Sequence, residues 1–257
     1  MKIDYKYNNI FKDDVKYFEK NGFPSDVFSR LSRGVSPILS IENLKLYNAL
    51  YAGHHITKLR KIIPWCEKYV NTTNKYSIVD WASGQGIASS MIIDELVRKN
   101  KLNSISRIFL IEPSEFAIKR AKEILINQIQ SYGETAPEII TIQKYFNAIQ
   151  ASDFYNNNSN EFLHLFSNAF DTDTTSTLRI MKIIQDLSNN CFIASTSPNY
   201  QQTTMAYLKI RAFISRLNAR ILSNEQGFES GWIYRVKGNY WGLMNISYNQ
   251  LILEVGK

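Results

Sequence analysis

The stretch that decides the fold is IVDWASGQGIAS, residues 78–89. Apolar and β-branched residues over 76–81 predict a buried strand that ends with Asp80 and Trp81. Small residues then predict a tight turn, and a helix is expected to begin near Gly86. Glycine and alanine let backbone lie directly against a ligand, and the first N–H groups of a helix can bind oxygen-rich groups. This order of elements therefore predicts a ligand site at the carboxyl edge of a sheet.

A second acidic residue closes a second predicted strand. The segment IFLIEPS, residues 108–114, places Glu112 directly after a strand expected over 107–111. A carboxylate one strand–helix–strand unit after the first motif is suited to accept hydrogen bonds from both hydroxyls of a ribose. Each element alone is common, but the two in this order and context are fairly specific.

Around these motifs, strands alternate with helices, which implies crossover connections and a parallel sheet covered on both faces. A closing antiparallel strand is common in such sheets. We therefore expect an α/β, Rossmann-like fold with a seven-stranded, mostly parallel sheet, helices on both faces and an N-terminal helical cap. The expected strands are residues 76–81, 107–111, 138–143, 162–166, 191–195, 232–236 and one within 245–255, and the expected helices are 86–99, 114–130, 175–187 and 202–222.

The N-terminal quarter of the chain shows the spacing of helices rather than of strands. We assign residues 1–75 to a cap that closes over the site and helps to choose the acceptor, and residues 76–257 to the cofactor-binding domain. Gly53 and Pro64 are expected to bend or break the longest helix of this cap. The helices expected there are residues 11–20, 25–31 and about 41–70.

The two motifs resemble those of a known superfamily. Residues 79–89 resemble the glycine-rich first motif of class I S-adenosylmethionine-dependent methyltransferases, and residues 110–114 resemble their second motif. The resemblance implies that S-adenosylmethionine is the cofactor. It also implies that Gly84 and Gly86 approach the amino-acid part of the cofactor and that Glu112 holds its ribose hydroxyls. The cofactor-site residues expected from it are Asp80, Ala82, Ser83, Gly84, Gly86, Glu112, Pro113, Asn147 and Ser167.

Two positions depart from the family pattern. Its usual first glycine is Ala82 here, a small change that such sites should tolerate. After the third strand, where members often have an acid near the adenine amino group, Asn147 either accepts that hydrogen bond or is a simple loop residue.

The resemblance also implies that Asp80 orients the ammonium group of the cofactor, directly or through water. The alternative is a Rossmann-like domain that binds a dinucleotide, usually marked by Gly-x-Gly-x-x-Gly, or that binds nothing.

The candidate catalytic residues follow the fourth strand. Methyl transfer requires mainly that donor and acceptor be aligned and water excluded, so a catalytic base is not obligatory. Ser167 and Asn168 are expected to position an acceptor, and Asp171 or Asp173 to act as a base. Alternatively, Asn168 and Asp173 only cap the following helix.

The sequence lacks the residues that several specialised kinds of methyl transfer need. After the fourth strand the chain reads FSNA, not the Asp/Asn-Pro-Pro-Tyr motif that amino-directed DNA methyltransferases share. Neither Cys66 nor Cys191 follows a proline, as the nucleophile of cytosine-C5 enzymes does. His54 and His55 are adjacent on an expected helix and point to different sides, so no metal site is predicted.

The charge of the chain is unevenly distributed. The net charge is +7, with +6 in residues 1–75, −3 in residues 76–198 and +4 in residues 199–257. The basic flanks either attract phosphate, which makes a nucleic acid a candidate partner, or are solvated faces. Basic and aromatic residues mix in the helix expected over 202–222, but its apolar spacing favours packing on the sheet.

Two cysteines far apart in sequence form no disulfide framework, and no secretory signal or membrane span is expected. We therefore expect a cytoplasmic protein without membrane association; the sequence leaves its oligomeric state open. The primary hypothesis is a methyltransferase that transfers the methyl group directly to an unidentified nucleic acid or small molecule. The alternative is a catalytically inactive, S-adenosylmethionine-binding or Rossmann-like subunit of a larger complex.

Overall fold

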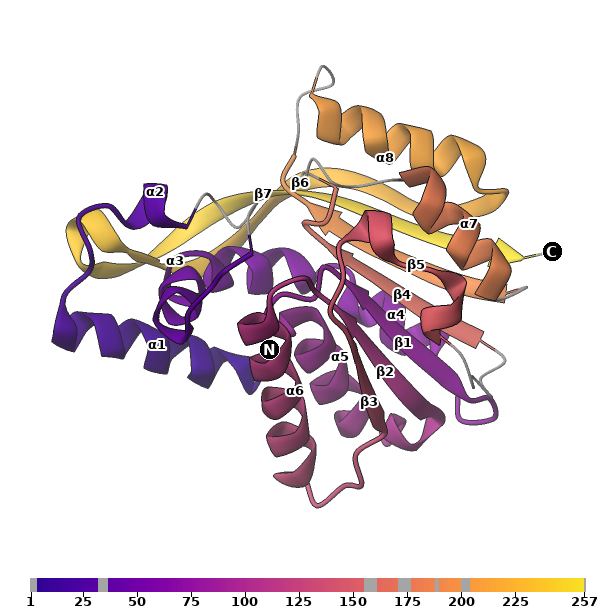
Figure 1. The fold of residues 1–257 in the computed structure, drawn as a ribbon, viewed down its shortest axis with the longest axis horizontal. Helices are drawn as coiled ribbons and strands as arrows, with labels where there is room; N and C mark the ends of the chain where they lie inside the picture. Colours follow the sequence, from indigo (N-terminus) through magenta and orange to yellow (C-terminus); the bar gives the residue numbers. More distant parts are fainter. Residues whose placement is uncertain are drawn as a thin grey trace.

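A seven-stranded sheet runs through the protein in the order β3-β2-β1-β4-β5-β7-β6 (Figure 1). The computed structural model describes residues 4–31, 37–154, 161–170, 177–187, 190–199 and 204–256. Five strands are parallel, and β7 lies antiparallel between β5 and β6. The predicted mostly parallel sheet is therefore confirmed. The strands are β1 Tyr76–Trp81, β2 Ile105–Ile111, β3 Glu138–Ile142, β4 Glu161–Ser167, β5 Asn190–Ser197, β6 Ala219–Arg235 and β7 Tyr240–Gly256.

Both faces of the sheet are buried, as a parallel sheet requires. Successive side chains of β1 point to opposite faces, so Ile78 enters one hydrophobic core while Val79 and Trp81 enter the other. The first core is covered by α4, α5 and α6, and the second by α7 and α8 (Figure 1). These helices are α4 Ile63–Tyr69, α5 Ile87–Arg98, α6 Glu115–Gln130, α7 Thr177–Leu187 and α8 Met205–Arg216.

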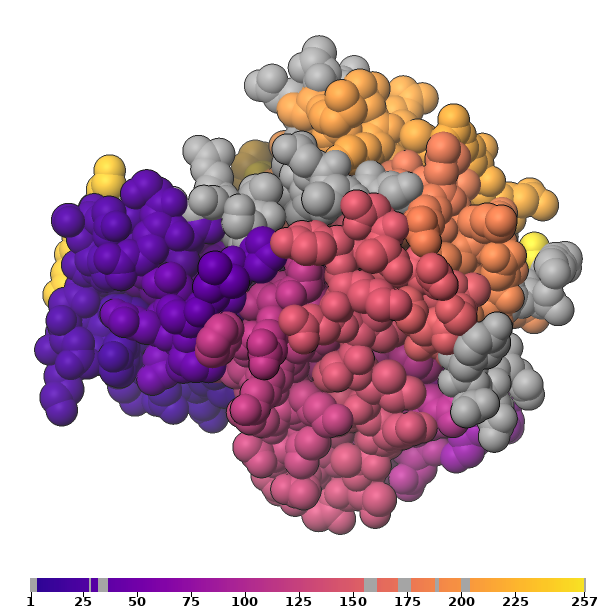
Figure 2. All heavy atoms as spheres, in the orientation of Figure 1, coloured from indigo at the N-terminus to yellow at the C-terminus, as the bar shows by residue number. Residues whose placement is uncertain are grey.

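The N-terminal segment is helical, as predicted, and covers one end of the molecule (Figure 2). The long helix expected over 41–70 is interrupted between Leu59 and Ile63, just before Pro64, and its second part packs against β5 and α5 of the sheet domain. The division into two domains stays a prediction. The N-terminal helices are α1 Tyr7–Asn21, α2 Val27–Arg30 and α3 Ile41–Leu59.

The C-terminal end differs from the prediction. The helix expected over 202–222 ends at Arg216, and β6 begins at Ala219. Residues 217–222 continue the apolar spacing of α8, but pairing with β7, such as Ile221 with Leu253, overrides this local preference. Two short strands were expected in this region, but β6 and β7 are longer, with 17 residues each.

Only part of this long hairpin belongs to the sheet. The pairing of β5 with β7 ends at Ser197 and Asn249, so residues 227–248, here called the hairpin extension, continue beyond the sheet. The extension reaches the N-terminal helices and packs against α3 (Figure 1). The N-terminal helices therefore contact both the sheet domain and this C-terminal hairpin.

Two glycines bring α3 and the hairpin extension into close contact. A Cβ atom added to Gly231 would lie 1.8 Å from Oγ1 of Thr57, and one added to Gly53 would lie 2.6 Å from the carbonyl oxygen of Trp232. Gly53 was expected to bend or break its helix, yet α3 continues through it. This glycine therefore serves the packing of the helix on the hairpin.

The contact at Gly231 predicts a strong effect of one methyl group. Gly231→Ala should lower the free energy of unfolding by about 1–3 kcal/mol, because the new Cβ atom overlaps Thr57. Gly256→Ala is the matched control, since its Cβ atom would come no closer than 3.6 Å to a neighbouring atom. Urea denaturation of both variants checks this; equal stability of the two would contradict the packing described here.

Candidate functional site

The turn after β1 has an uncommon backbone conformation. Ala82, Gly84 and Gly86 have φ angles of 54°, 51° and 75°, all in the left-handed region. Glycine adopts this region readily, whereas alanine does so at a cost of about 1 kcal/mol. The N–H of Ser83 donates to the carbonyl of Ile111 at 2.9 Å, so the turn is fastened to the end of β2.

Gly84 and Gly86 face different surroundings. A Cβ atom on Gly84 would meet nothing within 4 Å, and this residue lines a cavity. A Cβ atom on Gly86 would lie 3.1 Å from the Cβ atom of Ala121, which is on α6. Gly86 therefore lets α6 approach the turn, while Gly84 leaves bare backbone toward the cavity.

The carboxylate of Glu112 lies against the turn of residues 82–86, here called the glycine turn. One oxygen, Oε2, accepts from the N–H of Gly84 at 3.1 Å, and the other, Oε1, accepts from the N–H of Ser114 at 3.0 Å. Burial raises the pKa of Glu112 to about 7, although these two hydrogen bonds oppose that shift. The structure thus brings together Gly84 and Glu112, which the sequence assigned to one site.

Asp80 lies behind the turn rather than in the cavity. It is buried, and its Oδ2 atom accepts from the N–H of Ser89 at 3.2 Å and from the hydroxyl of that residue at 2.7 Å. Its Oδ1 atom has no hydrogen-bond partner in the described part of the chain. Burial raises the pKa of Asp80 to about 6. The carboxylate therefore fixes the first turns of α5 and keeps one unused acceptor.

A cavity of about 110 Å³ lies between the glycine turn, the end of β4 and α3. Of the predicted residues, Ala82, Ser83, Gly84, Glu112, Ser167 and Asn168 line it. Asn147 is exposed on the 3-10 helix η3, Phe146–Ala148, and neither it nor Pro113 is among the lining residues. The expected contacts of these two residues with a cofactor stay predictions. Asp171 and Asp173 lie outside the described residues.

The side chain of Asn168 is hydrogen-bonded to two residues of α3. Its amide oxygen accepts from the ammonium group of Lys58, and its amide nitrogen donates to Nδ1 of His55. Its φ angle is 55°, a left-handed conformation that asparagine tolerates better than most residues. The N–H of Asn168 donates to the carbonyl of Thr196 at 2.8 Å, which ties the ends of β4 and β5 together.

The contribution of α3 to this site was missed at the sequence level. Tyr47, His55 and Lys58 lie on one face of α3, and the first two line the cavity. Because Nδ1 of His55 accepts a hydrogen bond, its proton sits on Nε2, which lies 3.3 Å from the hydroxyl of Tyr47. Burial and the nearby Lys58 hold the pKa of His55 well below its usual value, so the imidazole is neutral. The helical spacing of Tyr47 and His55 could have revealed this face.

A buried polar network holds the turn from its other side. The side chain of Gln85 donates to the carbonyl of Leu44 at 2.9 Å and accepts from Arg120 at 2.6 Å. Arg120 also donates to both carboxylate oxygens of Asp14 at 2.9 and 2.7 Å, and Asn48 donates to Asp14 at 2.7 Å. The network therefore joins α1, α3 and α6 to the glycine turn.

Two kinds of feature are absent from the described residues. No three His, Cys, Asp or Glu side chains gather there as a metal ion would require. No helix in that part of the chain has the length and apolar character needed to cross a bilayer.

Comparison with known proteins gives the fold. No family model and no curated protein matches the sequence. A solved S-adenosylmethionine-dependent methyltransferase from Anabaena variabilis aligns with 99% of this chain and 97% of its own, at 10% identity and a TM-score of 0.51. One from Leishmania major aligns with 93% and 90%, at 9% identity and a TM-score of 0.49. An identity this low concerns the fold alone, and the chain shares its Rossmann-like α/β fold with the Anabaena variabilis protein.

Proposed function

We propose that the chain is an S-adenosylmethionine-dependent methyltransferase that acts on a small molecule. The observation that carries the proposal is the carboxylate of Glu112, which lies against a left-handed glycine turn at the edge of a cavity. A nucleotide-type cofactor needs this combination of bare backbone and a hydrogen-bond acceptor for its sugar.

The residues present fit the proposed cofactor. The open space at Gly84 would receive its amino-acid part, and Glu112 would accept from its ribose hydroxyls. The Oδ1 atom of Asp80 is buried, so it would meet the ammonium group only once the cavity has widened. When bound, S-adenosylmethionine supplies a methyl group activated by its sulfonium. Ligand sites usually measure about 300–1,000 Å³. A cavity of about 110 Å³ would therefore have to widen for a cofactor to enter.

The lining of the cavity favours a small acceptor. Tyr47 and His55 of α3 line the cavity together with the glycine turn, and Ile38 lines it too. An enclosed site excludes water and aligns two small reactants, which is what methyl transfer mainly requires. A nucleic acid would need a much wider opening than this cavity has. The positive charge of residues 1–75 and 199–257 alone therefore does not favour a nucleic acid as acceptor.

Ser167 and Asn168 are the residues proposed to position the acceptor. Asn168 is held by Lys58 and His55, and its amide also donates to the hydroxyl oxygen of Ser167 at 3.3 Å. The hydroxyl hydrogen of Ser167 has no acceptor among the residues that the structure describes, so it can donate to a polar group of the acceptor. His55 is neutral and engaged at both ring nitrogens, which makes it a positioning residue.

Removal of the Glu112 carboxylate should weaken cofactor binding. Glu112→Ala is expected to raise the Kd for S-adenosylmethionine by roughly tenfold to a hundredfold, because two hydrogen bonds to a charged acceptor are lost. Isothermal titration calorimetry measures the effect. Glu123→Ala, an exposed carboxylate on α6, is the matched control and should bind normally. Equal affinity of both variants would show that the cofactor does not bind at Glu112.

The same carboxylate predicts a pH dependence. With a pKa raised to about 7, Glu112 is mostly protonated at pH 6, and it must ionise to accept from both ribose hydroxyls. Affinity should therefore rise roughly five- to tenfold between pH 6 and pH 7.5, with proton release on binding. Titrations in buffers of different ionisation enthalpy measure both quantities. In Glu112→Gln this dependence should vanish; its persistence would assign it to another group.

A substitution at Asn168 separates catalysis from binding. Asn168→Gly keeps the left-handed backbone and removes the amide, so kcat should fall about tenfold or more while the Kd for the cofactor changes little. Transfer of a labelled methyl group to a fraction of cellular small molecules is the assay. If the wild type binds the cofactor but labels neither small molecules nor nucleic acids, the inactive-subunit alternative holds instead.

A further inference from the structure

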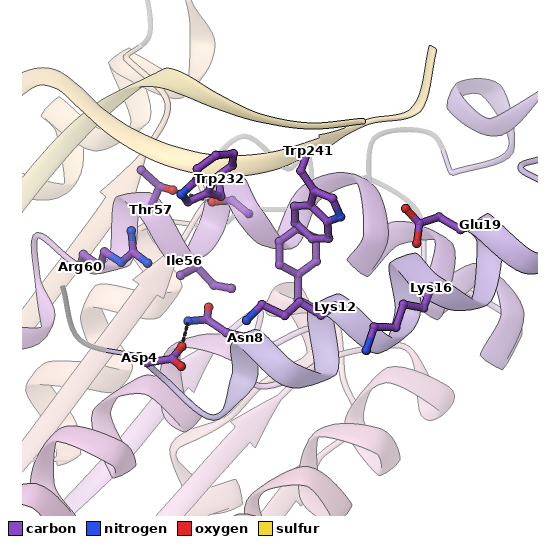
Figure 3. Close-up of a pocket in the computed structure, with 12 residues that line it drawn as sticks. Asp4, Asn8, Lys12, Lys16, Glu19, Ile56, Thr57, Arg60, Trp232 and Trp241 are labelled. Atoms are coloured by element: carbon purple, nitrogen blue, oxygen red, sulfur yellow. Dashed lines mark hydrogen bonds between the residues drawn. The ribbon is translucent and has the colours of Figure 1, made fainter. Parts of the chain in front are cut away.

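A second cavity, of about 630 Å³, lies between α1, α3 and the hairpin extension (Figure 3). Its apolar walls include Phe11 from α1, Ile56 from α3 and two tryptophans, Trp232 and Trp241, from the hairpin. Its volume falls within the range of about 300–1,000 Å³ that small-molecule sites usually occupy. This cavity is therefore large enough for a ligand without any rearrangement.

The second cavity is separate from the site at the glycine turn. It uses one face of α3, which carries Gly53, Ile56 and Arg60, whereas Tyr47 and His55 line the first cavity from the opposite face. The two cavities have no lining residue in common. A ligand in the second cavity would thus be a different molecule from the methyl donor and its acceptor.

The aromatic walls present flat surfaces to this space. Trp241 is held edge-on against Phe11, with ring centroids 5.1 Å apart, and against Tyr234, with centroids 5.5 Å apart. Trp232 is 56% exposed although it lines a cavity. A large exposed indole beside a fixed one is suited to stack against a planar apolar ligand.

The charged walls favour an anion. The side chains of Lys12 and Arg60 have no hydrogen-bond or ion-pair partner in the described ranges, and the Nε atom of Arg60 is buried without a partner. By contrast, the carboxylate of Asp4 accepts from Asn8 at 2.7 Å. Figure 3 shows the charged groups of Lys12 and Arg60 in one half of the cavity, together with the carboxylate of Asp4 that Asn8 holds, and Glu19 in the other half.

We propose that this cavity binds a small aromatic carboxylate. The planar ring lies against Trp232 and Trp241, and the carboxylate pairs with the ammonium group of Lys12 and the guanidinium group of Arg60. A guanidinium group matches a carboxylate in geometry as well as in charge. The cavity is bordered by two helices and a hairpin, and its volume suits a small molecule.

The test uses 2-naphthoate as the probe and its neutral amide, 2-naphthamide, as the matched ligand, both titrated by calorimetry. The wild type should bind 2-naphthoate saturably. The double variant Lys12→Gln/Arg60→Gln should bind it at least tenfold more weakly and bind 2-naphthamide as the wild type does. Trp232→Ala should weaken both ligands, and Lys182→Gln, which changes an exposed residue of α7, should weaken neither.

Three outcomes would overturn the proposal. They are the absence of saturable binding, equal affinity of the wild type and the double variant, and displacement of the probe by S-adenosylhomocysteine, which would place it in the other cavity. Because the titrations need no methyl transfer, the proposed site can fail while the methyltransferase proposal holds, and the reverse is equally possible.

Discussion

The hydrogen bond between the N–H of Gly84 and the carboxylate of Glu112 is the contact on which the candidate site depends. It joins the turn after β1 to the end of β2, beside the bond from Ser83 to Ile111. The carboxylate is partly buried in this position, and burial raises its pKa to about 7. A buried acceptor with few partners is costly in the folded protein unless a ligand supplies further donors. Each oxygen of the carboxylate can accept a further hydrogen bond, which the ribose of the proposed cofactor would supply.

The sequence predicted the sheet domain well because its signals are local. Each parallel strand is a short apolar run, and strand-terminal residues such as Asp80 and Glu112 mark the carboxyl edge by their position. Parallel topology then places these edges side by side, so Gly84, Glu112 and Ser167 could be assigned to one site without coordinates.

The parts that were not predicted depend on contacts between distant segments. The hairpin extension contains glycines and polar residues typical of turns, and its strands form because Gly231 and its neighbours pack on α3. Likewise, the spacing of Tyr47 and His55 shows only that they share a helix face. Their position beside the same cavity as the glycine turn depends on contacts such as the network of Gln85, Arg120 and Asp14, residues that are 35 or more positions apart from one another along the chain.

The long hairpin has a consequence for how the protein can be divided. β6 and β7 lie at one edge of the sheet and continue to the N-terminal helices, so one end of the hairpin pairs with the sheet and the other end packs on those helices. A shortened chain that lacks the N-terminal helices would leave residues 227–248 as a two-stranded ribbon in water, with its tryptophans uncovered. Isolated ribbons of this kind are marginally stable and tend to aggregate through their edges. The N-terminal helices thus cover the part of the hairpin that extends beyond the sheet.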